Sequence, residues 1–240
     1  MLEVAGLTKA YRQGEGIFNI DFQAAPGTIV GIIGANGAGK TTLLRCIVGL
    51  LKQDAGVIDI AGNRPGTEAA KCLTAFVPDH PHLFPSLTVA EHILFKAKAF
   101  GVPRDKLEES VGQALEVVGL SAYADRTSGS LSKGQKQKVM LASAYQHQAQ
   151  LFVLDEPTNG LDIPSRQWLA KWLVDQKAKG KTILVSSHSL DFIKDVADSC
   201  LMLHKGKSQG VDQVPQAQSG KLAWGDHVIQ RLGGAVQVHE

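Results

Sequence analysis

A glycine-rich segment between an apolar run and a helix-like stretch restricts the fold of this chain more than any other feature. The segment GIIGANGAGKTT spans residues 31–42 and carries the spacing Gly34-x-x-x-x-Gly39-Lys40-Thr41. A loop that only turned the chain would not need the Lys-Thr-Thr ending. This spacing, with a strand before it and a helix after it, is that of a phosphate-binding loop.

Strand-like runs recur along the chain, and helical patterns lie between them. The expected strands are residues 2–7, 28–33, 56–60, 73–77, 151–154, 182–187 and 200–204. Three of these runs are largely apolar and do not alternate, as in the central strands of a parallel sheet that is covered on both faces: 28–33, 151–154 and 182–187. The expected helices between strands are 40–50, 165–179 and 189–197. This alternation predicts an α/β fold with crossover connections.

Residues 88–148 break the alternation, because they contain three helix-like stretches and no convincing strand. Thr88 followed by Glu91 has the spacing of a capping box, and Ser132 is a candidate cap for the last of the three helices. We therefore expect an inserted helical subdomain. The first 60 or so residues look β-rich apart from the helix after the loop, and residues 11–27 are expected to contain a hairpin.

Composition excludes several classes of protein. The formal net charge of +2 is too small to indicate a polyanionic partner, so no nucleic acid is expected. The three cysteines form no CxxC pair, which argues against a zinc site or a disulfide framework. No secretory signal opens the chain, and no apolar run approaches the ~20 residues that span a bilayer, so the chain is not expected to cross a membrane unaided.

The phosphate-binding loop predicts specific contacts with a nucleotide. Its backbone N–H groups and the helix N-terminus form a site for the phosphates. Lys40 can bridge the β- and γ-phosphates of ATP, and the Thr41 hydroxyl can ligate Mg²⁺. The candidate nucleotide-binding residues of the loop are Gly34, Asn36, Gly37, Ala38, Gly39, Lys40, Thr41 and Thr42.

The segment LFVLDEP at residues 151–157 places two acidic residues at the end of an apolar run. A carboxylate at the end of a buried strand is costly to desolvate unless it meets a cation or a hydrogen-bond network, so Asp155 is a candidate Mg²⁺ partner. Glu156 is placed to orient or deprotonate a water molecule. A helix-capping Asp-Glu pair in a surface loop is the alternative.

Further motifs resemble one family. LSKGQKQK at residues 131–138 resembles the LSGGQ signature of the ATP-binding cassette (ABC) family, and it is followed in that family's order by GLD at 160–162 and by SSH ending at His188. Tyr11 lies where the family places an aromatic residue against the adenine ring. The resemblance runs from about residue 2 to residue 207, and it implies a bacterial exporter-type ATPase subunit.

The resemblance implies a P-loop NTPase (RecA-like) core with a β-rich N-terminal subdomain and an α-helical subdomain at about residues 80–148. Residues 1–207 would form the ATPase domain, and 208–240 an extension of unknown role. The resemblance also implies that two cassettes pair head to tail. The signature residues Ser132, Gly134 and Gln135 of one copy would then face the γ-phosphate bound by the other. His188 would contact that phosphate, and Asp162 would link the two sites.

The chain departs from the family pattern at two positions. Asp79 stands where the family usually has Gln. An unshielded carboxylate ~4 Å from a phosphate charge would cost about 4 kcal/mol. Asp79 would therefore be either a metal ligand or held away from the site. Lys133 replaces the first glycine of the signature, a position that can lie in the first helical turn without positive φ.

The resemblance implies ATP binding and hydrolysis at the cytosolic face of the membrane, coupled to transport in the export direction through separate membrane-spanning subunits. The alternative is a soluble cassette ATPase that acts on a cytosolic assembly. The surface for the membrane partner is expected at residues 79–100, where Leu83, Phe84 and Leu87 look exposed. Burial of these side chains inside the helical insert is the other interpretation.

Overall fold

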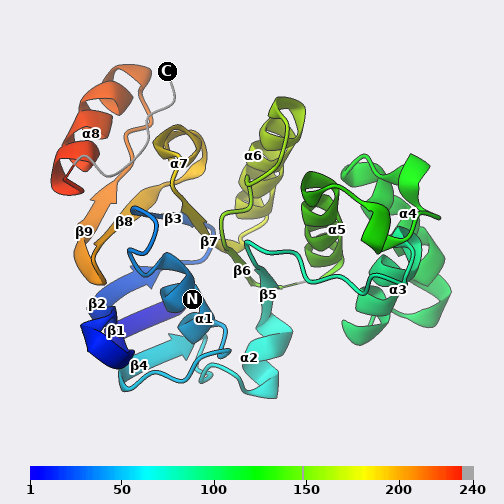
Figure 1. Ribbon diagram of the computed structural model, residues 1–240, viewed down its shortest axis with the longest axis horizontal. Helices are drawn as coiled ribbons and strands as arrows, with labels where there is room; N and C mark the ends of the chain where they lie inside the picture. Colours follow the sequence, from blue (N-terminus) through cyan, green and yellow to red (C-terminus); the bar gives the residue numbers. More distant parts are fainter. Residues whose placement is uncertain (148, 234–240) are drawn as a thin grey trace.

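The computed structural model describes residues 1–147 and 149–233, and within them nine strands form one sheet (Figure 1). The strand order across the sheet is β4-β1-β2-β9-β8-β3-β7-β6-β5. The strands are β1 (Leu2–Ala10), β2 (Gly16–Ala24), β3 (Ile29–Ile33), β4 (Ala55–Ile60), β5 (Thr74–Val77), β6 (Leu151–Leu154), β7 (Thr182–Ser187), β8 (Ser199–His204) and β9 (Lys207–Gln213). All seven predicted strands are therefore present.

The three runs predicted to be central strands lie inside the parallel part of the sheet. β3 pairs with β7 and β8, and β6 pairs with β5 and β7, all in parallel. Every residue of β3, β6 and β7 is buried. Side chains alternate between two hydrophobic clusters: Val30 and Ile32 pack with Leu43 of helix α1 (Lys40–Ile47), whereas Ile29 and Ile33 belong to the cluster on the opposite face.

Helices cover that opposite face of the parallel strands. Helix α6 (Ile163–Ala178) contributes Leu169 and Leu173 to its cluster, and helix α7 (Leu190–Val196) contributes Ile193. The positions of α1, α6 and α7 agree with the predicted helices to within a few residues at each end. Because both faces are covered, most positions of these strands carry apolar side chains, and the exceptions in β7 are the buried residues Thr182, Ser186 and Ser187.

The N-terminal strands are antiparallel, and the predicted hairpin is present. β1 pairs with β2 on one side and with β4 on the other. β9 joins this part to the parallel strands, since it pairs with β8 antiparallel and meets β2 at Phe18 and Lys207. The sequence did not predict β9 because its residues, KSQGVDQ, are mostly polar and its side chains are exposed or half-buried. Its position depends on backbone hydrogen bonds to neighbouring strands.

The helical subdomain lies at the end of the molecule opposite β1 and β4 (Figure 1). It contains α3 (Val89–Ala99), α4 (Leu107–Val117) and α5 (Lys133–Gln146). Both predicted caps are present: Thr88 and Glu91 form a capping box at α3, and Ser132 and Gln135 form one at α5. Residue 148, the predicted last residue of this subdomain, lies outside the described residues.

Two helices were not predicted. The six-residue α2 (Glu68–Leu73) begins at the cap Thr67, whose side chain accepts a hydrogen bond from the Ala70 N–H. Helix α8 (Gln218–Arg231) follows β9 and places Trp224 and Val228 in the same hydrophobic cluster as α6 and α7. The chain beyond the predicted boundary at residue 207 therefore packs on the main core as far as it is described. Residues 234–240 of the predicted extension lie outside the described residues.

Among the residues that the structure describes, none of the helices combines the length and apolar character needed to cross a bilayer.

Candidate functional site

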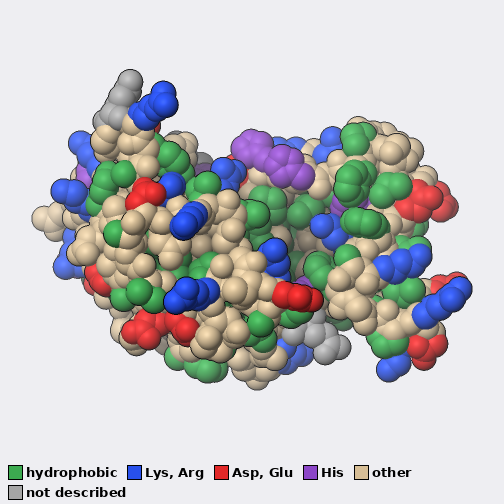
Figure 2. All heavy atoms as spheres, turned by 90° about the horizontal axis from the view of Figure 1, so that it is seen from below, with side chains coloured by type: hydrophobic (Ala, Val, Ile, Leu, Met, Phe, Trp, Pro, Cys, Tyr) green, Lys and Arg blue, Asp and Glu red, His purple; other side chains and the backbone are tan. Residues whose placement is uncertain are grey.

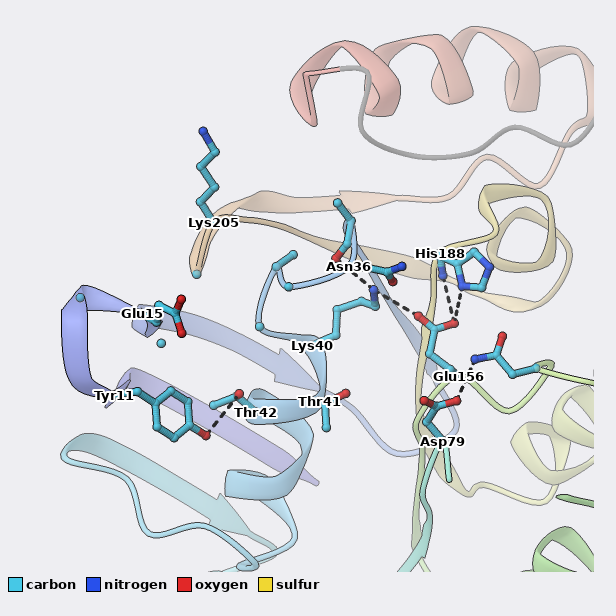
Figure 3. A pocket seen from close by; sticks show the side chains of 18 residues that line it. Tyr11, Glu15, Asn36, Lys40, Thr41, Thr42, Asp79, Glu156, His188 and Lys205 are labelled. Carbon is cyan, nitrogen blue, oxygen red and sulfur yellow. Dashed lines mark hydrogen bonds and ion pairs between the residues drawn. The ribbon is translucent and has the colours of Figure 1, made fainter. Parts of the chain in front are cut away.

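A pocket of about 790 Å³ lies where β3 ends and α1 begins (Figure 3). Its walls come from the carboxyl ends of the parallel strands and from the hairpin between β1 and β2, the usual location of ligands in open α/β sheets. The predicted residues that line it are Tyr11, Asn36, Gly37, Ala38, Gly39, Lys40, Thr41, Thr42, Asp79, Glu156 and His188. The fold thus brings together residues from five separate segments of the sequence.

The glycines of the loop are needed by the local packing. Gly39 has φ +104°, and a Cβ atom added there would lie 2.4 Å from Cγ2 of Ile17. A Cβ at Gly34 would lie 2.4 Å from the backbone oxygen of Leu203. Because α1 begins at Lys40, the first N–H groups of a helix face the pocket, where they can donate to an anion.

Lys40 and Lys205 are the lysines that line the pocket, and the side chain of Lys40 is almost fully buried. Its Nζ donates hydrogen bonds to the backbone oxygens of Gly34, at 2.7 Å, and Ala35, at 3.3 Å. It also lies 3.1 Å from Oε1 of Glu156. The loop carbonyls and this carboxylate therefore hold the ammonium group at the base of the loop.

Asp155 and Glu156 follow β6 directly, and Ser186 of β7 joins them. The Ser186 hydroxyl donates to Oδ1 of Asp155, at 2.7 Å, and accepts from the Glu156 N–H, at 2.9 Å. Burial raises the pKa of the Asp155 carboxyl, and hydrogen bonds from Ser186 and Thr41 oppose that rise. In the sequence, Ser186 is recognised only as part of the SSH motif, and nothing there predicts that its hydroxyl connects Asp155 with the Glu156 N–H.

Glu156 lies between two basic side chains (Figure 3). One carboxylate oxygen is the partner of Lys40, and the other lies 2.9 Å from Nδ1 of His188. The backbone N–H of His188 also donates to that second oxygen, at 3.2 Å. Three residues that the sequence predicted separately, Lys40, Glu156 and His188, thus contact one another, an arrangement that suits a carboxylate that must be oriented for proton transfer.

Asp79 and Tyr11 lie on two other walls of the pocket. Oδ1 of Asp79 accepts a hydrogen bond from Nδ2 of Asn159, at 2.8 Å, and its Oδ2 lies 3.0 Å from Nδ1 of His80. The Tyr11 ring is half-exposed, and its hydroxyl is 3.5 Å from Oγ1 of Thr42. Asn159 was not among the predicted residues, because only the fold brings it to Asp79, 80 positions away.

The signature residues do not line the pocket of their own chain. Ser132 instead caps α5: its Oγ accepts from the Gln135 N–H, at 3.2 Å, and the Gln135 Oε1 accepts from the Ser132 N–H, at 3.0 Å. A Cβ at Gly134 would lie only 2.3 Å from the backbone oxygen of Gly160, so the start of α5 packs directly on the GLD segment. Lys133 is the first residue of α5 and has no positive φ, as expected.

Asp162, the last residue of the GLD segment, also lies outside the pocket. Its Oδ1 accepts a hydrogen bond from the Ser165 N–H, at 3.0 Å, and so caps α6. Hydrogen bonds from Ser165 hold the pKa of this carboxyl below its ordinary value. Within one chain, Asp162 therefore has a structural role as the cap of α6, and this role is separate from its predicted link to a second site.

Comparison with known proteins agrees with this geometry. The family model for ABC transporters matches residues 17–159. The SkfA peptide export ATP-binding protein SkfE of Bacillus subtilis (strain 168) is 43% identical over 233 residues, which are 97% of each chain. The Nod factor export ATP-binding protein I of Rhizobium sp. (strain N33) is 33% identical over 86% of this chain and 68% of that protein.

A solved structure of an ATP binding subunit of an ABC transporter has a TM-score of 0.86 to this chain, with 31% identity, and covers 97% of this chain and 99% of its own. Family model, relatives and structure lead to the same assignment, which the sequence motifs predicted. The chain belongs to the ABC transporter family and is one of its ATP-binding, ATP-hydrolysing subunits.

Proposed function

We propose that this ATPase drives export of a substrate through separate membrane-spanning subunits, and that it does so at the cytosolic face of the membrane. The observation that carries the chemistry is the meeting of Lys40, Glu156 and His188 in one pocket behind the phosphate-binding loop. The direction of transport is supported by the relatives, two of which are named as export proteins. Those names do not favour the alternative of a cytosolic cassette that acts on another assembly.

Charge balance supports a divalent cation beside the nucleotide. Asp79, Asp155 and Glu156 bring three carboxylates to the pocket or its floor, and Lys40 is already paired with one of them. A triphosphate would add further negative charge, which Mg²⁺ is suited to offset with oxygen ligands. The hydroxyl of Thr41 and the carboxylate of Asp155 are the ligands that we propose, since both are oxygen donors and lie beside each other.

The protein's own residues would then act in a defined order. The phosphates draw the Lys40 ammonium away from Glu156, because a polyphosphate carries more negative charge than one carboxylate. The freed Glu156 orients a water molecule and takes its proton as the water oxygen bonds to the γ-phosphorus. The bond from that phosphorus to the bridging oxygen breaks, and ADP and phosphate leave. His188 donates a hydrogen bond toward that phosphate, and Tyr11 packs against the base.

A second copy of a cassette would complete the site. Ser132, Gly134 and Gln135 lie outside the pocket of their own chain, at the exposed N-terminus of α5. The N-terminus of a helix of this length favours an anion, so the γ-phosphate of a facing copy is a suitable partner. We propose a head-to-tail pair in which Asp162 lies near the boundary between the two sites.

The membrane partner would contact the helical subdomain. Phe84 and Phe95 are 52% and 47% exposed, and their rings meet edge to face with centroids 5.6 Å apart. Leu83 and Leu87 are half-buried, so the predicted patch is exposed in part. Figure 2 shows hydrophobic side chains gathered at the end of the molecule that α3 and α4 occupy. An exposed apolar patch of this kind is typical of a protein contact.

The replacement of Glu156 by Gln tests the proposed mechanism. Binding should survive, because the amide keeps the size and polarity of the side chain, whereas proton transfer to it is lost. We expect turnover to fall by at least about 100-fold, within the range attributed to a general base. The protein should also elute as an ATP-bound dimer in gel filtration with ATP and Mg²⁺.

Glu116→Gln, an exposed position on α4, is the matched control and should behave as the unmodified protein. If Glu156→Gln hydrolysed ATP at the normal rate, or stayed monomeric with saturating ATP and Mg²⁺, the proposed roles of Glu156 and of the dimer would be wrong.

A further inference from the structure

A side-chain hydrogen bond connects two loops of the pocket. Asp79 lies two residues beyond the end of β5, and Asn159 lies three residues beyond Glu156. The Asn159 amide donates to Oδ1 of Asp79, at 2.8 Å, and this interaction is drawn as the dashed line that ends on Asp79 in Figure 3. The Asp79 side chain is only 25% exposed, so the bond is partly shielded from water.

This bond continues the pairing of two strands beyond their ends. β5 and β6 are parallel neighbours, and the Asp155 N–H still donates to the backbone oxygen of Val77, at 2.8 Å. Beyond that point the segments that follow β5 and β6 leave the sheet, and their backbone pairing stops. The Asp79–Asn159 contact is the next connection between them, now made by side chains.

Asn159 is also attached to the turn that carries Glu156. Its backbone N–H donates to the backbone oxygen of Glu156, at 3.1 Å, and so closes a turn that contains Pro157. Glu156 itself has φ +47°, in the left-handed region that residues with a side chain seldom adopt. A residue in that region stays there only when its surroundings hold it. Ser186 holds its N–H, and Asn159 holds its C=O.

We propose that Asp79 is a positioning residue: it holds Asn159, and through Asn159 the turn that orients Glu156 for hydrolysis. Both oxygens of Asp79 already have partners, Asn159 and His80, so this carboxylate has a role that needs no contact with nucleotide or metal. An ionised carboxylate is a stronger acceptor than an amide oxygen, which suits it to holding the Asn159 amide. The role rests on the proposed function of Glu156.

The test is a double-mutant cycle with Asp79→Ala, Asn159→Ala and the double variant, measured by steady-state ATP hydrolysis. Each single variant should lower kcat about 10-fold, the effect of one lost hydrogen bond to a charged group, with KM and the affinity for a fluorescent ATP analogue within about twofold. The double variant should be no slower than the single ones, because both remove the same contact. Asp79→Asn keeps an acceptor oxygen and should stay within about threefold of the unmodified protein. Asp175→Asn, exposed on α6, is the matched control.

Two results would overturn the proposal. Losses that multiply to about 100-fold in the double variant would show that Asp79 and Asn159 act independently. An Asp79→Asn variant as slow as Asp79→Ala, or one that needs more Mg²⁺ for half-maximal rate, would instead make Asp79 a metal-side ligand.

Urea denaturation of the same four proteins separates this proposal from the function on which it rests, because it measures the Asp79–Asn159 coupling without turnover. Additive losses of stability would refute the contact. If the losses of stability are instead coupled while the unmodified protein hydrolyses no ATP, that result would support the contact and refute the assignment of Glu156.

Discussion

Ser186 is the residue whose loss the structure allows us to evaluate most fully. It lies on β7 and is fully buried. Its hydroxyl is both the donor to Oδ1 of Asp155 and the acceptor for the Glu156 N–H. Ser186→Ala therefore removes two hydrogen bonds at once and leaves a buried carboxylate oxygen and a buried amide without that partner.

The magnitude follows from the two groups left unpaired. An unsatisfied buried polar group costs about 1–3 kcal/mol, so the pair costs roughly 2–6 kcal/mol, and we expect about 3 kcal/mol because Asp155 keeps its hydrogen bond from Thr41. Ser143→Ala is the matched control. The Ser143 hydroxyl, also buried, donates to the backbone oxygen of Val139 inside helix α5, and its loss leaves no charged group unpaired. We expect it to cost less than about 1 kcal/mol.

The loss of folding stability in Ser186→Ala should depend on pH in a defined direction. Burial raises the pKa of Asp155 above its ordinary 3.8, and Ser186 lowers it, so Ser186→Ala raises it further. A carboxyl with a raised folded pKa favours the folded state in acid, below its unfolded pKa, and that contribution is lost as the pH rises through the folded pKa. The penalty of Ser186→Ala should thus be largest at neutral pH and decrease as acid protonates Asp155.

Urea unfolding of the unmodified protein, Ser186→Ala and Ser143→Ala at neutral pH and near pH 4 measures these differences. A thermal melt at neutral pH gives a second measure. A loss of about 3 kcal/mol should lower the unfolding temperature of Ser186→Ala by roughly 6–12 °C, at about 2–4 °C per kcal/mol for a chain of this size. The reasoning is wrong if Ser186→Ala is no less stable than Ser143→Ala, or if its penalty increases on acidification.

Two further predictions concern binding. Lys40→Ala should weaken the affinity for a fluorescent ATP analogue at least about 10-fold, because it removes the buried cation of the loop, and unchanged affinity in the titration would contradict this role. Phe84→Asp should lower the stimulation of ATP hydrolysis by the membrane subunit and leave intrinsic hydrolysis near normal, because Phe84 is half-exposed and lies outside the pocket. An equal loss of both activities in the hydrolysis assay would indicate a folding defect instead of a lost contact.

Much of the fold could be predicted because its signals are local. The apolar strands, the capping boxes at Thr88 and Ser132, and the phosphate-binding loop each depend on residues within a few positions of one another. The same holds for Lys133, whose place in the first turn of α5 follows from the cap before it. β9 and α8 could not be predicted in this way. β9 is a polar strand whose hydrogen bonds go to distant segments, and the apolar side chains of α8 meet a core that other segments build.

For the site, the order of motifs along the chain was enough to name the loop, the carboxylates that follow β6, and His188 as parts of one ATPase. The partners of those groups were decided only by tertiary structure. Ser186 bridges Asp155 and the Glu156 N–H across two strands, and Asn159 reaches Asp79 from 80 positions away. A motif records which chemical groups are available, whereas a buried polar group must find a hydrogen-bond partner in whichever segment the sheet places beside it.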